Sequence, residues 1–227
     1  GNKTYVDVGT DTLIVTGKVG GGTTDSYIRT ASTGRLKLIN VDVDGKDFPI
    51  GHSKYTPLKI ENGSGHDWIT SVYDSITADP PHGTTGAVLA TWDIRPSVNP
   101  PAGGADITFY FDSTTQVGPN FNAPMYVGQG LQAWHRRDTT YWLAAGVPAG
   151  ITQVSGTFCS VKVTGLTEFC PYALSRIGLP LPIKLVAFDV KTISSAHSYL
   201  TWELAACCSK DARFEVEKST DRQNFKS

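Results

Sequence analysis

The chain has 227 residues, with 20 Lys and Arg against 21 Asp and Glu, so its formal net charge is −1. This balance leaves no basic face for nucleic acid and no polybasic arm for anionic lipid. Charged residues make up 18% of the chain and Gly, Pro, Ser and Thr are abundant, which favours strands and turns over helices. No apolar stretch is long enough to cross a membrane. We therefore predict an all-β protein that binds no nucleic acid and inserts into no membrane.

Residues 1–45 are short alternating segments separated by glycine-rich breaks such as Gly20-Gly21-Gly22. The segments around Tyr5, Leu13 and Leu36 alternate apolar and polar side chains, which is typical of strands. Two interpretations follow. Either these segments form a β-rich cap made of the last rungs of a β-helix, or they are the first strands of a sandwich.

Carboxylates at alternate positions in Asp42-Val43-Asp44-Gly45 could converge on a hard cation such as calcium. The later glutamate and the spacing of an EF-hand are missing, however. Asp44-Gly45 stands between two apolar segments, which favours a tight hairpin turn in which both residues tolerate positive φ. The sequence therefore predicts a turn here, and we expect neither a metal nor a cofactor.

Residues 46–178 are expected to form a β-sandwich module. In Ile107 to Phe111 the apolar side chains alternate with Thr108 and Tyr110, which is the pattern of a strand with one buried face. The segment from Gly156 to Thr164 repeats this pattern, with Cys159, Val161 and Val163 on one face.

A polar turn at Asp138-Thr139-Thr140 is flanked by aromatic residues that suggest a ligand site. Trp134, Tyr141 and Trp142 could stack on sugar rings, with neighbouring Arg, Asp and His side chains orienting hydroxyl groups. The alternative is that one aromatic of each pair faces the core, as large rings usually do in sandwiches. Both interpretations stay open at the level of sequence.

Four cysteines allow several pairings. Cys159 and Cys170 lie on the expected arms of a hairpin that turns at residues 164–167, so we predict a disulfide between them and an oxidising location. Cys207 and Cys208 are adjacent, and neighbouring cysteines rarely bond to each other without strain. No Cys-x-x-Cys or His-x-x-x-His spacing supports the competing metal interpretation.

Residues 179–227 follow a stiff connector at Gly178-Leu179-Pro180-Leu181-Pro182. Three alternating segments then predict strands at Ile183–Val190, Tyr199–Leu204 and Arg213–Ser219. These make up the first strands of an incomplete fibronectin-type or immunoglobulin-like module. Half a sandwich leaves a sheet edge and an apolar face uncovered, so downstream strands or a neighbouring molecule must supply the rest.

Several of these segments resemble a known protein family. The order of Trp92-Asp93-Ile94, Met125-Tyr126-Val127-Gly128 and the run from Thr164 to Leu174 resembles a C-terminal β-sandwich of proteins exported by the type IX secretion system of Gram-negative bacteria. Leu181 to Leu185, Leu200 to Glu203 and Phe214 to Asp221 are similar to the opening half of the fibronectin-type module that commonly precedes the sorting domain of such proteins.

This resemblance implies an extracellular or outer-surface location. It also implies a structural or adhesive segment of a longer multidomain precursor, whose partners are other modules of that precursor, neighbouring subunits or surface glycans. A chain that opens at Gly1 without a signal peptide agrees with such a segment. In these bacteria O-glycans are attached within an Asp-Ser/Thr-apolar pattern. Four segments of this chain are similar to that pattern, and their acceptor residues would be Thr12, Ser75, Ser113 and Thr139.

The sequence contains no nucleophile elbow, Walker loop, dinucleotide-binding glycine pattern or zinc-protease helix. We therefore expect a non-catalytic protein that serves as a stalk, an adhesin or a fibre subunit completed by strand addition. The alternative is a carbohydrate-binding accessory module of a secreted polysaccharide-degrading enzyme. Exposed rings at Trp134 and Trp142 would favour this alternative, and buried ones would favour the structural role.

Overall fold

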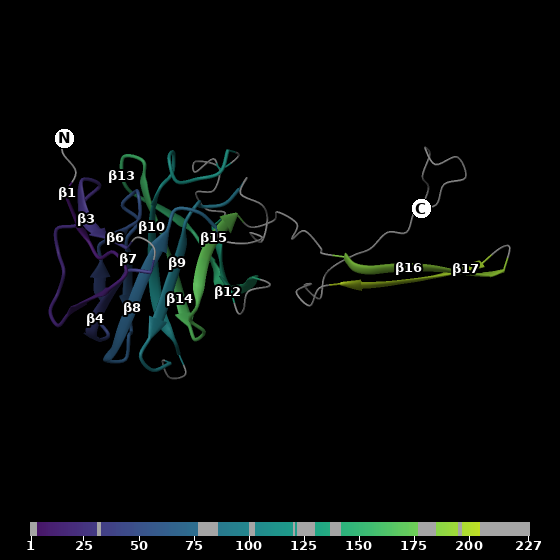
Figure 1. The fold of residues 1–227 in the computed structure, drawn as a ribbon, viewed down its shortest axis with the longest axis horizontal. Helices are drawn as coiled ribbons and strands as arrows, with labels where there is room; N and C mark the ends of the chain where they lie inside the picture. Colours follow the sequence, from purple (N-terminus) through teal and green to yellow (C-terminus); the bar gives the residue numbers. More distant parts are fainter. Residues whose placement is uncertain are drawn as a thin grey trace. The chain divides into compact units, whose positions relative to one another are not determined.

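The computed structural model describes residues 4–30, 33–76, 86–99, 103–119, 121, 130–136, 142–176, 185–194 and 197–204 (Figure 1). The chain divides into two compact units, Gly1–Pro180 and Leu181–Ser227. Every regular element among the described residues is a β-strand, which confirms the predicted all-β class.

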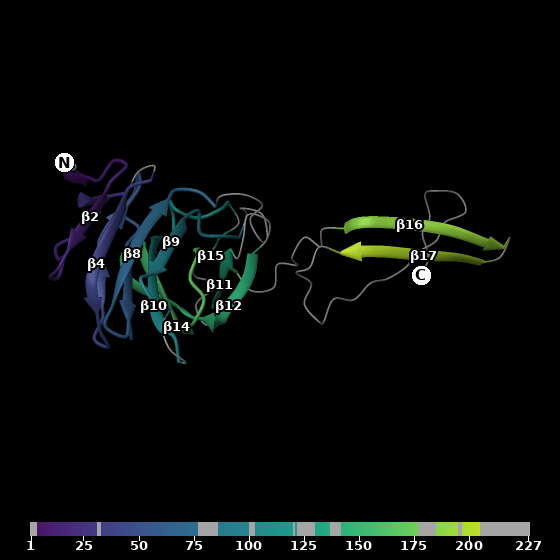
Figure 2. The same cartoon turned by 60° about the horizontal axis from the view of Figure 1, so that its bottom comes forward.

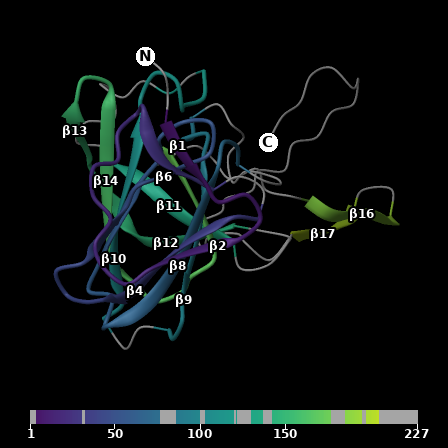
Figure 3. The same ribbon diagram turned by 60° about the vertical axis from the view of Figure 1, so that its left-hand side comes forward.

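The first unit is built around two sheets that face each other (Figures 2 and 3). The five-stranded sheet has the order β13-β14-β10-β7-β5, and its strands are β5 (Lys46–Phe48), β7 (Leu58–Glu61), β10 (Ala105–Asp112), β13 (Ile151–Ser155) and β14 (Phe158–Leu166). The seven-stranded sheet has the order β12-β11-β15-β9-β8-β4-β2, and its strands are β2 (Thr12–Val15), β4 (Arg35–Val41), β8 (His66–Tyr73), β9 (Thr91–Pro96), β11 (Leu131–Arg136), β12 (Trp142–Ala149) and β15 (Pro171–Arg176).

The core fills the space between these sheets. The predicted alternation holds in β10 for the apolar side chains, because Ile107, Phe109 and Phe111 are fully buried; of the two polar positions, Tyr110 is partly exposed and Thr108 is buried. Trp92 and Tyr172 lie opposite each other on β9 and β15, and both rings contact Phe109 of the other sheet. The two inner faces therefore interdigitate as in a β-sandwich.

The N-terminal strands pair in parallel, as the rungs of a β-helix do. Strands β1 (Thr4–Asp7), β3 (Ser26–Arg29) and β6 (Ile50–Gly51) form a three-stranded sheet, while β2 pairs in parallel with β4. Thr4 lies opposite Ser26 and Ile28 opposite Ile50, so each turn of the chain takes about 22 residues. Because β4 also pairs antiparallel with β8, these rungs continue into the sandwich.

The chain turns at Asp44-Gly45 as predicted, but the turn does not close a hairpin, because the strands on its two sides belong to different sheets. Gly45 has a φ of 76° and donates its amide to the Asp42 carboxylate at 3.3 Å. A side chain at Gly45 would collide with the Ile60 carbonyl. The turn leads from β4 of one sheet to β5 of the other, so it is a corner between layers.

The described residues of the second unit form an antiparallel hairpin of β16 (Leu185–Ser194) and β17 (His197–Leu204). Phe188 and Val190 lie on one face of β16 and are 56% and 51% exposed. Two of the three strands predicted for this region are therefore observed, and the third, Arg213–Ser219, lies outside the described residues.

An ion cluster links two strands of the seven-stranded sheet that are not direct neighbours. Asp93 is 2% exposed and accepts hydrogen bonds from Arg35 at 2.7 Å and from Arg95 at 2.9 Å. Arg35 stands on β4 and Asp93 on β9, with β8 between them. The pair therefore spans the sheet across β8.

Replacing this carboxylate tests the contribution of the cluster. We expect Asp93→Ala to lower the free energy of unfolding by about 3 kcal/mol, because it leaves the partly buried Arg35 guanidinium without its partner. The control is Asp7→Ala, which removes the exposed ion pair with Arg29 and should cost about 1 kcal/mol or less. Equal losses in urea unfolding of the two variants would contradict this account.

Candidate functional site

The predicted ligand platform at the β11–β12 hairpin is not formed by its tryptophans. Trp134 is 8% exposed and Trp142 is 5% exposed, so neither ring offers a face to a sugar. Trp134 also donates its indole N–H to Ser175 Oγ at 2.7 Å. Both faces of β11 are covered, since Leu131 to His135 are all buried. Tyr141 lies outside the described residues.

The predicted disulfide between Cys159 and Cys170 is also wrong, because both residues are free thiols. The prediction assumed a hairpin, but β14 belongs to the five-stranded sheet and β15 to the seven-stranded sheet. Cys159 points into the core at 4% exposure, while Cys170 lies in the segment that crosses between the sheets. Cys207 and Cys208 lie outside the described residues.

Cys170 instead joins a chain of three polar groups that the sequence did not predict. Its Sγ lies 3.2 Å from His135 Nδ1, and His135 Nε2 lies 3.5 Å from Glu168 Oε2. This order of thiol, imidazole and carboxylate has the composition of a catalytic triad. Burial, aided by the nearby Glu168 and Asp93 carboxylates, raises the pKa of the Cys170 thiol to about 11. The arrangement therefore holds a neutral thiol, and a nucleophile at neutral pH would need the thiolate.

Thiol reactivity tests this description. With Cys207 and Cys208 replaced by serine, we expect Cys159 and Cys170 to react with a disulfide reagent at pH 8 at least ten-fold more slowly than in the same protein unfolded in urea. The reason for Cys170 is that a thiol with a pKa of about 11 is ionised in roughly one molecule in a thousand at pH 8. For Cys159, burial raises the pKa of the thiol and also shields it from the reagent. The rate should rise as the pH increases towards 11. Rapid labelling at pH 8, or a mass that shows an oxidised pair, would contradict it.

The predicted glycan acceptors have different environments. Thr12 on β2 and Ser75 after β8 are exposed, so an enzyme could reach their hydroxyl groups. Ser113 is half-buried and donates its hydroxyl to the Thr157 carbonyl at 2.9 Å. Thr139 lies outside the described residues.

Strands β1 and β2 make up the first rung of the N-terminal region. Each of them is an edge strand with no neighbour on one side among the described strands. Strand β1 ends the three-stranded sheet and β2 ends the seven-stranded sheet. Arg35 donates its amide to the Asp11 carbonyl, which places the backbone groups of Leu13 towards β4 and those of Thr12 and Ile14 towards the free edge. Ile14 is 58% exposed.

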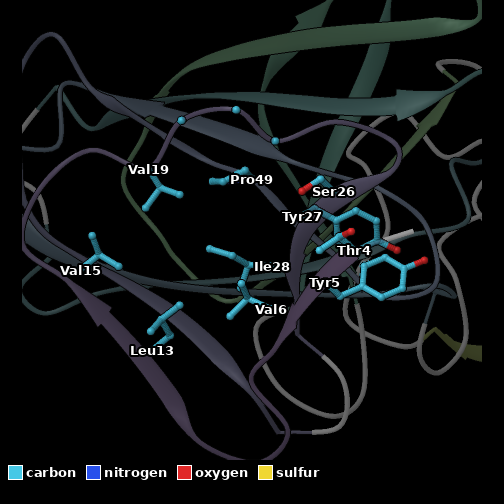
Figure 4. A pocket seen from close by; sticks show the side chains of 13 residues that line it. Thr4, Tyr5, Val6, Leu13, Val15, Val19, Ser26, Tyr27, Ile28 and Pro49 are labelled. Carbon is cyan, nitrogen blue, oxygen red and sulfur yellow. The ribbon is translucent and has the colours of Figure 1, made fainter. Parts of the chain in front are cut away.

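An apolar cavity of about 300 Å³ opens between these two edge strands (Figure 4). Leu13, Val15, Val19 and Ile28 line it together with the glycine backbone of residues 20–22. Tyr5 and Tyr27 stand at one side of the cavity (Figure 4). The interior of the rung is therefore open at the end where β1 and β2 lack neighbours.

A row of aromatic rings lies on the outer face of the five-stranded sheet. Phe158 stacks between Tyr55 and Tyr110, with centroid distances of 5.8 and 5.9 Å and interplanar angles of 10° and 11°. All three rings are partly exposed. The alternation in β10 already placed Tyr110 on the face opposite to the core, but no local pattern indicated that Tyr55 and Phe158 would join it.

Comparisons with known proteins add no relative. No family model, no curated protein and no solved structure matches the chain. The described part of the chain contains no helix that could span a bilayer. Within the same residues, no group of His, Cys, Asp and Glu side chains has the arrangement of a metal site.

Proposed function

We propose that this protein is a non-catalytic, extracellular structural or adhesive module of the type IX-secreted class, joined to its neighbours by strand addition. The observation that carries the proposal is the open rung formed by β1 and β2. Two parallel edges and an apolar interior are presented at the same end of one unit.

The open rung is well suited to pair with further strands. An edge strand exposes unpaired N–H and C=O groups, and natural proteins usually protect such edges with charge, proline or a covering segment. In β2 the outward-facing side chains are Thr12 and Ile14, and neither carries a charge. A strand added here would gain main-chain hydrogen bonds, and its apolar side chains would fill the cavity.

The second unit gives independent support. A two-stranded hairpin is only marginally stable by itself in water, and β16–β17 exposes Phe188 and Val190 on one face. Completion of this module by further strands would bury that face. Among the described strands, each unit therefore has a sheet that further strands would extend.

The extracellular location and the secretion class rest on the sequence resemblance. Surface display also agrees with the exposed hydroxyl groups of Thr12 and Ser75, which lie in the glycan acceptor pattern. The role of accessory module to a polysaccharide-degrading enzyme loses the support expected from Trp134 and Trp142, because both rings are buried.

Assembly of the purified chain tests the proposal. We expect concentration-dependent polymers in light scattering and negative-stain images, and we expect Ile14→Pro to reduce the polymer fraction at least ten-fold. Proline at this position removes an amide that points to the free edge, so the β2–β4 ladder keeps its hydrogen bonds.

The matched control is Ile14→Val, which keeps the amide and a β-branched side chain and should assemble like the wild-type chain. Circular dichroism of the proline variant checks that the sandwich remains folded. A wild-type chain that stays monomeric at all concentrations, or a proline variant that assembles normally, would refute strand addition at this edge.

A further inference from the structure

We propose that the aromatic row of Tyr55, Phe158 and Tyr110 is a binding site for a neutral glycan chain. The site lies on the outer face of the five-stranded sheet, away from the β1 and β2 edges. It differs from the predicted platform at the β11–β12 hairpin in both residues and sheet.

The row is held in place by the strands that carry it. Tyr110 stands on β10 opposite Ser160 of β14, and its amide donates to the Pro57 carbonyl at 3.1 Å. Phe158 begins β14 opposite Asp112. Tyr55 is supported from the other side by Tyr27, whose ring centroid lies 5.7 Å away and which is 4% exposed. Rings fixed in this way lose little conformational freedom when a ligand binds.

Polar side chains lie beside the row on the same face. Asp47, Lys59, Thr108 and Lys162 occupy successive register positions across β5, β7, β10 and β14. Thr108 precedes Tyr110 by two residues, so this polar line runs next to the rings. Asp47 is exposed, which leaves its carboxylate available for hydrogen bonds, whereas the partly exposed Lys59 already donates to Glu61.

The Asp47 carboxylate acts electrostatically on both tyrosines of the row. Burial is the main cause that raises the pKa of Tyr55 to about 12, and the Asp47 carboxylate raises it further. The same two causes raise the pKa of Tyr110. A tyrosine hydroxyl can donate a hydrogen bond to a ligand while the exposed part of its ring contacts the same ligand.

This combination favours a carbohydrate over other ligands. Sugar rings have apolar C–H faces that pack on aromatic rings, and hydroxyl groups that both donate and accept hydrogen bonds. The charges near the row have both signs, because Lys59 and Lys162 pair with Glu61 at 3.0 and 2.8 Å. A face with such balanced charge does not select an anionic polymer. A peptide strand would need a sheet edge, whereas the row lies on a sheet face.

Affinity electrophoresis of the full chain tests this site. The probes are neutral polysaccharides, namely β-glucan, xylan and galactomannan, with polygalacturonate as the anionic comparison. We expect retardation by at least one neutral polymer, and we expect Phe158→Ala to weaken that binding at least ten-fold. Phe158→Tyr keeps the ring and should retain binding within about three-fold.

Phe188→Ala is the control for ring removal, since Phe188 is exposed on the second unit and lies outside the row. It should bind like the wild-type chain, and so should Ile14→Pro, which separates this site from strand addition. No retardation by any neutral polymer, binding to polygalacturonate alone, or binding that survives Phe158→Ala in a folded variant would each overturn the proposal.

Discussion

The contact of Phe109 with Trp92 and Tyr172 determines how the two sheets of the first unit fit together. Trp92 and Tyr172 come from neighbouring strands of the seven-stranded sheet, and Phe109 comes from the centre of the five-stranded sheet. All three side chains are fully buried. This contact fills the middle of the core. Because successive side chains of a strand point to opposite faces, every second residue of β10 points to the outer face.

That alternation explains what the sequence could predict. A period of two identified the β10 and β14 segments and their buried faces, since both depend only on local pattern. Local pattern does not say which sheet a strand joins. For this reason the predicted β14–β15 hairpin and its disulfide were wrong, and the burial of Trp134 and Trp142 had to come from the structure. The row of Tyr55, Phe158 and Tyr110 was missed because its members are far apart in the sequence.

The same architecture separates two kinds of surface. The faces of the first unit are covered by ion pairs and by partly exposed rings, whereas the β1 and β2 edges present bare backbone and an apolar interior. Sheet edges with unpaired backbone groups favour main-chain pairing with a partner strand. Sheet faces that carry exposed rings favour reversible contact with a soluble ligand. Strand addition at the β1 and β2 edges would therefore leave the ring-bearing face uncovered.

Hydrogen exchange at single amides tests the central claim, strand addition at the β2 edge, most directly. Leu13 donates towards β4 and the amides of Thr12 and Ile14 point to the free edge. Measured by nuclear magnetic resonance after quenched exchange, the Leu13 amide should be protected in both dispersed and assembled protein. The Thr12 and Ile14 amides should exchange rapidly in dispersed protein and become protected on assembly. If those two amides exchange equally fast in both states, strands are not added at this edge and the account fails.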